Sequence, residues 1–143
     1  MSIIFKRKNK KKIYTSQDTH KWKIKQKCLR LILECAKSSY PKEFGGLLRT
    51  NSKEKNTIIE VVILPGTISG DSHAVFQLHM LPIDYSIVGT VHSHPTSNPY
   101  PSQTDLQLFE KYGRIHIIIA KPYTEKSWRA YNHRGNNIEL TVI

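Results

Sequence analysis

Residues 87–105 read IVGTVHSHPTSNPYPSQTD, an apolar run that leads into two histidines, a proline and a polar loop. Side chains at positions i and i+2 of a β-strand project from the same face. His92 and His94 should therefore lie side by side, with Ser93 on the opposite face. Pro95 ends the strand, and the loop that follows returns the chain towards these histidines.

Ser102-Gln103-Thr104-Asp105 has the S-x-x-[DE] form of a helix capping box, with Ser102 at the N-cap. It predicts a helix over residues 102–112, whose first turn would bring Asp105 beside the two histidines. Two imidazoles and one carboxylate leave a fourth coordination position open, which is the layout of catalytic rather than structural zinc. The same donors also accept Fe²⁺, Co²⁺ or Mn²⁺, so the sequence leaves the native metal open.

Hydrophobic periodicity and turn residues predict the other elements. A helix is expected over residues 26–40, ended by Pro41. Strands are expected over residues 22–25, 44–49, 57–64, 74–78, 87–94, 115–120, 128–131 and 138–143. Because strands outnumber helices, the predicted fold class is α/β, a single domain with one mixed β-sheet flanked by two or three helices.

The predicted helix over residues 26–40 carries both cysteines of the chain. Its apolar stripe is read as Cys28, Leu31, Ile32, Cys35 and Ala36. Cys28 and Cys35 lie two turns apart, too far for an easy disulfide, and neither belongs to a Cys-x-x-Cys pair. They are interpreted as small buried hydrophobic residues rather than a metal site.

Charge is distributed unevenly over the 143 residues, which carry a formal net charge of +11. Residues 1–30 hold eleven Lys and Arg and a single acid, so the remaining chain is close to neutral at +1. Residues 1–20 are therefore predicted to be a basic, flexible tail, and residues 21–143 the folded domain. Nucleic acid is not expected as a partner beyond weak contact through this tail.

No run of eighteen or more apolar residues is present, and the N-terminus lacks the apolar segment of a signal peptide. We therefore expect no contact with a membrane, and residence in the cytoplasm.

The five other histidines have no ligand-like spacing and are expected to be surface or hydrogen-bonded residues: His20, His73, His79, His116 and His133. The oligomeric state is left open.

The motif His92-Ser93-His94-Pro95-x6-Ser102-x2-Asp105, with Glu43 upstream, resembles the JAMM (MPN-plus) metalloproteases of the compact archaeal and bacterial type. The resemblance covers the chain from the helix before Glu43 to the C-terminus. It implies the JAMM/MPN fold, a sheet flanked by helices that is similar to cytidine deaminase. Catalytically inactive MPN relatives lack some of these positions, so the intact motif favours an enzyme.

The resemblance also implies a role for each residue of the motif. His92, His94 and Asp105 would bind one Zn²⁺ per chain, which lowers the pKa of a water molecule. Glu43 would act as general base and then general acid without touching the metal. Ser102 would direct its hydroxyl to the oxyanion, a role that competes with its role as a plain N-cap.

The substrate implied by the family is the bond after the C-terminal Gly-Gly of a ubiquitin-like modifier or sulfur-carrier protein. Gly45-Gly46, next to Glu43, would either let an extended substrate approach a strand edge or serve as a simple turn. The alternative from another class is a non-catalytic MPN scaffold that only binds protein partners. A third reading, a nucleic-acid-binding module, rests on the basic tail.

Overall fold

The computed structural model describes residues 21–64 and 84–143. The predicted strand over residues 74–78 and the predicted N-terminal tail lie outside these residues. Within the described residues, no helix is long and apolar enough to cross a membrane.

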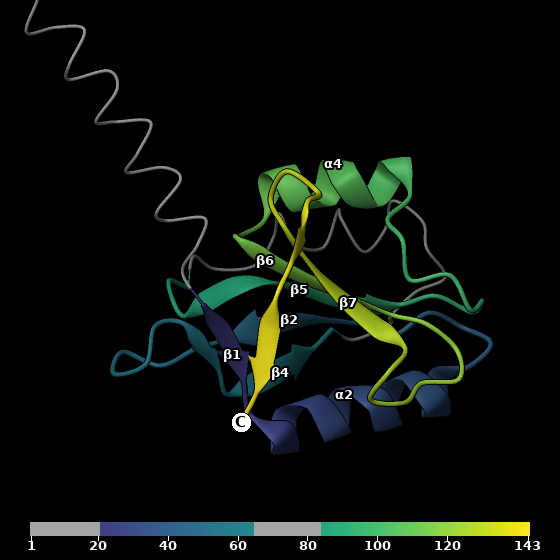
Figure 1. Ribbon diagram of the computed structural model, residues 1–143, viewed down its shortest axis with the longest axis horizontal. Helices are drawn as coiled ribbons and strands as arrows, with labels where there is room; N and C mark the ends of the chain where they lie inside the picture. The colour runs from purple at the N-terminus through teal and green to yellow at the C-terminus, as the bar shows by residue number, and fades with distance from the viewer. Residues whose placement is uncertain (1–20, 65–83) are drawn as a thin grey trace, which may run out of the picture.

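A mixed six-stranded sheet forms the centre of the fold (Figure 1). Strands β5 and β6 are parallel, and every other neighbouring pair is antiparallel. The α/β class with a mixed sheet is therefore confirmed. In spatial order the strands are β4 (Glu60–Ile63), β2 (Gly45–Arg49), β5 (Ile87–Ser93), β6 (Ile115–Ile119), β7 (Trp128–Asn132) and β8 (Asn137–Ile138).

A second, three-stranded sheet, which the sequence did not predict, joins both ends of the described chain. Its strands are all parallel, in the order β3 (Thr57–Ile58), β1 (Trp22–Ile24) and β9 (Leu140–Val142). The predicted strands over 57–64 and 138–143 are thus each divided between the two sheets. The break falls between Ile58 and Ile59. Lys25 N donates to Ile58 O in the smaller sheet, whereas Ile59 N donates to Arg49 O in the larger one. The uninterrupted apolar run at 57–64 gives no sign of this change of sheet.

Two helices cover opposite faces of the sheet (Figure 1). Helix α2 (Gln26–Ser39) buries Cys28, Leu29, Ile32, Leu33 and Ala36 against the larger core. Leu31 was predicted to face inward but is 48% exposed. At 100° per residue Leu31 lies about 130° from the centre of the buried arc, so the predicted stripe was rotated by about 60° from the face that is buried. Cys28, Ile32 and Ala36 of that stripe are buried as predicted. Both cysteines are free, as expected.

Helix α4 (Gln103–Lys111) packs on the other face, over a smaller core of Phe109, Ile118 and Tyr131. Strand β6 lies between the two cores, and all five of its residues are buried. A strand covered on both faces is expected to read as a continuous apolar run, which explains its sequence IHIII.

His116 is the polar exception in β6 and is completely buried. Its Nδ1 lies 2.8 Å from Thr90 Oγ1, and its Nε2 lies 3.4 Å from the Gly113 carbonyl oxygen. The Phe109 ring stacks on it with a centroid distance of 4.3 Å. Nε2–H can donate to Gly113 and Nδ1 can accept from Thr90, so the neutral imidazole is satisfied. Burial lowers the pKa of His116 to about 4.

This burial predicts an acid-dependent loss of stability. Between pH 6.5 and 4 the unfolded chain binds a proton at His116 that the folded chain excludes, so up to about 3 kcal/mol of unfolding free energy is lost as pH falls. Urea unfolding of the wild type and His116→Gln at several pH values would measure this. The gap in stability between them should be widest above pH 6.5 and should narrow towards pH 4. A gap that does not change with pH would contradict the assignment.

Candidate metal centre

The three predicted metal ligands meet at the C-terminal end of β5. His92 and His94 project from one face, while Ser93 between them is 1% exposed and points to the other. Asp105 reaches them from the first turn of α4. One potential ligand atom from each of the three lies within 4.8 Å of the other two. The side chains are only 12–15% exposed, so they are partly shielded from water.

The spacing of the two imidazole nitrogens fits a single tetrahedral ion. His92 Nε2 lies 3.2 Å from His94 Nε2. Asp105 Oδ1 lies 3.1 Å from His92 Nε2, and Oδ2 lies 3.1 Å from His94 Nε2. Ligands about 2.0 to 2.1 Å from a tetrahedral zinc are separated from one another by about 3.3 Å. The two imidazoles are therefore spaced to hold zinc, and one carboxylate oxygen of Asp105 would be the third ligand, which leaves one coordination position open.

His94 is oriented by its second ring nitrogen. Nδ1 lies 2.8 Å from the Asn98 carbonyl oxygen, to which it can only donate. That bond turns the lone pair of Nε2 towards Asp105 and His92 in a neutral imidazole. The Tyr123 hydroxyl also donates to the His94 carbonyl oxygen at 3.0 Å. Sequence reasoning missed Tyr123, because a contact 29 residues away leaves no local pattern.

The carboxylate of Asp105 is held in its ionised form. Burial raises the pKa of Asp105, but hydrogen bonds to His92 and His94 outweigh burial and keep this pKa well below its usual value. Burial lowers the pKa of His94, but the bonds to Asp105 and to the Asn98 carbonyl oxygen, together with the charges of Asp105 and Glu43, raise this pKa above its usual value. An ionised carboxylate is the form that ligates a metal, whereas a proton on His94 would compete with one.

Ser102 completes the capping box that the sequence predicted. Its Oγ accepts from Asp105 N at 3.1 Å, and Asp105 Oδ2 accepts from Ser102 N at 2.9 Å. A hydroxyl can accept one hydrogen bond and donate another. The capping role therefore leaves the hydroxyl hydrogen of Ser102 able to serve as a donor, and the two predicted roles are compatible.

Glu43 lies two residues before the start of β2 and is half-buried. Gly45 pairs with His92 in the antiparallel register, which places Glu43 opposite His94 if the register continues. Its charge contributes to raising the pKa of His94. The candidate metal-binding group consists of His92, His94 and Asp105, and the role of Glu43 as a base that does not touch the metal stays a prediction.

Ser93 holds the start of β2 in place. Phe44 N donates to Ser93 Oγ at 2.8 Å, and Ser93 N donates to Phe44 O at 2.9 Å. These bonds fix the residue next to Glu43 to the residue between the two histidines. Sequence reasoning assigned Ser93 no role, although its position opposite the ligand face was a usable signal.

Gly46 is explained by packing within the sheet. A Cβ atom there would lie 2.7 Å from Val61 Cγ2 of β4 and 3.1 Å from the Val62 carbonyl oxygen. The glycine therefore allows β2 and β4 to approach closely. Packing against β4 is therefore sufficient to explain Gly46, without a role for this glycine in binding an extended substrate.

Comparisons with known proteins agree with this geometry. Residues 25–131 match the family described as prokaryotic homologs of the JAB domain. A probable metalloprotease from Haloferax volcanii is 34% identical over 122 residues, covering 80% of this chain and 75% of that protein.

Solved structures show the same fold. A JAB1/MPN domain protein from Archaeoglobus fulgidus aligns with a TM-score of 0.70 and 36% identity, covering 87% of this chain and 99% of that one. A structure described as a JAMM metalloprotease-like zinc site in the proteasome and signalosome aligns with a TM-score of 0.66 and 38% identity. That alignment covers 86% of this chain and 98% of the other.

The fold and the His-His-Asp group define a zinc metallopeptidase of the JAMM type. The chain belongs to the family of prokaryotic homologs of the JAB domain. The resemblance to the JAMM/MPN family and the expectation of zinc as cofactor are thereby confirmed. The chemical roles of the individual site residues stay predictions.

Metal content tests the group directly. Protein purified without chelator should contain about one zinc per chain, and His92→Ala should lose it because two donors alone bind weakly. Elemental mass spectrometry measures this, with His133→Ala as a control that removes a histidine away from the motif. Equal zinc in His92→Ala and His133→Ala would contradict the assignment.

Proposed function

We propose that this protein hydrolyses the isopeptide or peptide bond after the C-terminal Gly-Gly of a ubiquitin-like modifier or sulfur-carrier protein. The observation that carries the proposal is the placement of Glu43. Continuing the β2–β5 register two residues beyond the Gly45–His92 pair would bring this acid to the partly shielded face where His92, His94 and Asp105 converge. An acid beside a three-ligand metal site is the arrangement of a hydrolase that activates water.

His92, His94 and Asp105 would hold zinc, which when bound supplies Lewis acidity and lowers the pKa of a water molecule. Glu43 then removes a proton from the attacking water and passes it to the leaving amine. The Ser102 hydroxyl donates to the oxygen that becomes negative in the tetrahedral intermediate, a contribution of about 3 kcal/mol. Ser93 keeps Glu43 in position through its bonds to Phe44.

A thin Gly-Gly tail fits the backbone surroundings of this site. Strand β4 is one of the two edge strands of the six-stranded sheet, and among the described residues no strand pairs with its outer edge. An extended peptide can add to such an edge through main-chain hydrogen bonds, and glycines allow the closest approach. The modifier and its linkage are identified by experiment.

The alternative is a non-catalytic scaffold that binds protein partners. Such a scaffold has no need for an ionised, half-shielded carboxylate held between two imidazoles, whereas a metallopeptidase requires it. Ubiquitin-like partners and cytoplasmic residence stay predictions from the sequence.

Substitution of Glu43 separates the proton-transfer role from metal binding. Glu43→Gln should keep its zinc and lose about 10²- to 10⁴-fold in kcat, because the amide cannot accept the proton. Glu125→Gln, which removes an exposed acid in the β6–β7 connection, should match the wild type. Wild-type turnover in Glu43→Gln would show that another group is the base.

Substrate class is tested with a reporter fused behind a ubiquitin-like modifier that ends in Gly-Gly, beside a fusion ending in Ala-Ala. Mass spectrometry should locate cleavage after the second glycine, with little cleavage of the Ala-Ala fusion, because added methyl groups obstruct a narrow groove. Equal cleavage of both, or cleavage elsewhere, would contradict the proposed substrate while leaving the metallopeptidase class intact.

Ser93 is predicted to act as a positioning residue. Ser93→Ala should retain zinc but lower kcat by roughly ten- to a hundredfold with a smaller change in KM, because Glu43 loses its fixed position. Ser93→Thr keeps the hydroxyl and should recover part of the loss. An alanine variant with full turnover would remove Ser93 from the mechanism.

A further inference from the structure

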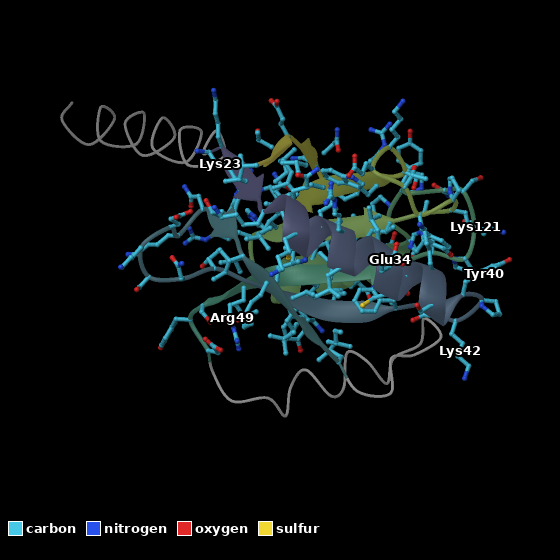
Figure 2. All side chains as sticks on the ribbon, turned by 90° about the horizontal axis from the view of Figure 1, so that it is seen from below. Lys23, Glu34, Tyr40, Lys42, Arg49 and Lys121 are labelled. Carbon is cyan, nitrogen blue, oxygen red and sulfur yellow. The ribbon has the colours of Figure 1, made fainter. Side chains whose placement is uncertain are left out.

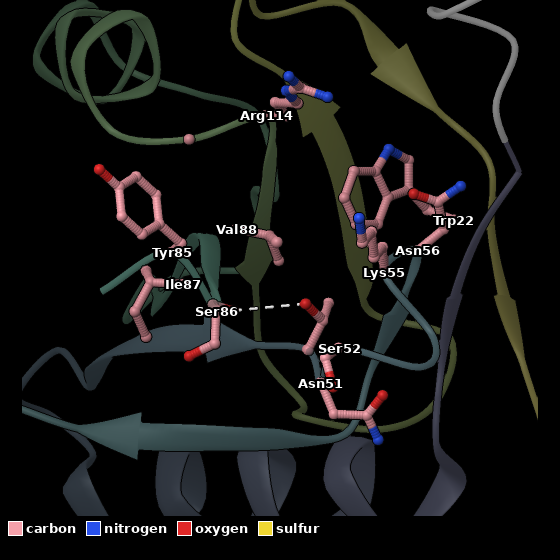
Figure 3. Close-up of a pocket in the computed structure, with 12 residues that line it drawn as sticks. Trp22, Asn51, Ser52, Lys55, Asn56, Tyr85, Ser86, Ile87, Val88 and Arg114 are labelled. Atoms are coloured by element: carbon pink, nitrogen blue, oxygen red, sulfur yellow. Dashed lines mark hydrogen bonds between the residues drawn. The ribbon is translucent and has the colours of Figure 1, made fainter. Parts of the chain in front are cut away.

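A second cavity lies at the end of β5 opposite the metal centre and has a volume of about 740 Å³ (Figure 3). Its walls come from β1, the β2–β3 connection, the start of β5 and the turn before β6. Trp22, Lys55, Tyr85 and Arg114 are among the lining residues. The JAMM motif does not include any of them.

This cavity is well separated from the metal centre. Ile87, at the start of β5, lines the cavity, and His92 lies five residues further along the strand, or about 17 Å. Figure 2 places Lys23 and Arg49 at one end of the molecule and Tyr40 and Lys42, which precede Glu43, at the other. A ligand in the cavity would leave the metal centre open.

The polar groups of the cavity suit an anion. Lys55 and Arg114 are its cations, and none of the described residues that line it is a carboxylate. Asn51 Oδ1 accepts from the backbone N–H groups of Lys53 and Glu54 at 3.0 and 2.7 Å. That leaves the NH₂ group of Asn51 as a donor, so the wall offers donors and positive charge together.

Two aromatic rings flank the same cavity. In Figure 3, Tyr85 and Trp22 lie on its two sides, with Arg114 near the top between them. Tyr85 is 94% exposed, and Trp22 is half-buried in a strand paired with β9. Exposed aromatic rings beside cations are the surface on which unpaired bases stack.

The positive surface continues beyond the cavity. An adjoining hollow of about 630 Å³ shares Ser52, Lys55 and Asn56 with it. The hollow adds Lys21, Lys23 and Lys53, and Glu54 is the single acid that lines either space. Five cations against one carboxylate therefore follow the β2–β3 connection. This extent exceeds what a mononucleotide with one phosphate group would contact.

We propose that this surface, which we call the basic–aromatic face (Lys21, Trp22, Lys23, Lys53, Lys55, Tyr85 and Arg114), binds single-stranded nucleic acid. The cations track the phosphates, while bases stack on Trp22 and Tyr85. Lys53, Lys55 and Arg114 lie within residues 31–143, whose near-neutral balance hid them, since net charge does not show where charges gather. The binding site is independent of the metal centre and of the proposed peptidase activity.

Charge reversal on the face tests the phosphate contacts. We expect Lys53→Glu/Lys55→Glu/Arg114→Glu to weaken binding of a labelled fifteen-residue oligothymidine to the full chain at least tenfold by fluorescence anisotropy. The slope of log affinity against log salt should flatten by about 2, at roughly 0.7 for each lost phosphate contact.

The matched control reverses three cations elsewhere, Arg30→Glu/Lys37→Glu/Lys126→Glu, with the same change in net charge and the N-terminal basic run intact. It should bind within about threefold of the wild type. Equal losses in both variants would show that net charge or the N-terminal run alone attracts the oligonucleotide, and would overturn the proposal. Retained zinc in all variants verifies that they are folded.

Stacking on Trp22 can be measured by tryptophan fluorescence, because the chain has only two tryptophans and the other can be replaced. In Trp128→Phe the oligonucleotide should quench the remaining emission, and in Trp22→Phe it should leave the emission unchanged.

Poly-glutamate should compete weakly with the oligonucleotide and cause no quenching. Competition as strong as that of the oligonucleotide, without quenching, would assign the face to acidic proteins. Adenosine monophosphate binding as tightly as the oligonucleotide would indicate a mononucleotide site. Either result would overturn the proposal.

Discussion

Strand β5 is hydrogen-bonded on both edges, to β2 on one side and β6 on the other, and the candidate site depends on its register. A slip of one residue would turn His92 and His94 into the core and bring Ser93 to the metal-binding face. Glycine secures this register, since any Cβ atom on Gly89 would collide with the Ile115 carbonyl oxygen. The packing that fixes the register of β5 therefore also fixes the geometry of the site.

The capping box of α4 joins the folding of a helix to the construction of the site. Asp105 Oδ2 accepts from the Ser102 backbone N–H and also lies 3.1 Å from His94 Nε2. A partly buried carboxylate without partners would be costly, and these contacts compensate for its desolvation. The helix N-terminus also favours a negative charge there. The capping contacts of the helix thus help to set both the position of this ligand and its ionised form.

The sequence predicted the elements and the convergence of the site well, because both follow from short-range patterns. The i and i+2 alternation around His92, and the capping box at Ser102, need only local geometry. The division of residues 57–64 between two sheets could not be predicted, since no glycine or proline marks Ile59. Leu31 was misplaced because a stripe including Cys35 satisfies helical spacing equally well. Contacts of Tyr123 with His94, and the gathering of Lys53, Lys55 and Arg114, depend on tertiary structure alone.

The charged groups at the two ends of β5 differ in how they are paired. At the C-terminal end, the partly buried His92, His94 and Asp105 share one set of hydrogen bonds, and a further cation in contact with Asp105 would compete with a metal ion for the carboxylate. At the N-terminal end the cations are separated by hydroxyls and amides, and no described carboxylate lines the larger cavity to neutralise them. Their positive charge is therefore available to attract an anion from solution. A separation of about 17 Å exceeds the Debye length at physiological salt, so each end can keep its own electrostatic character within one small domain.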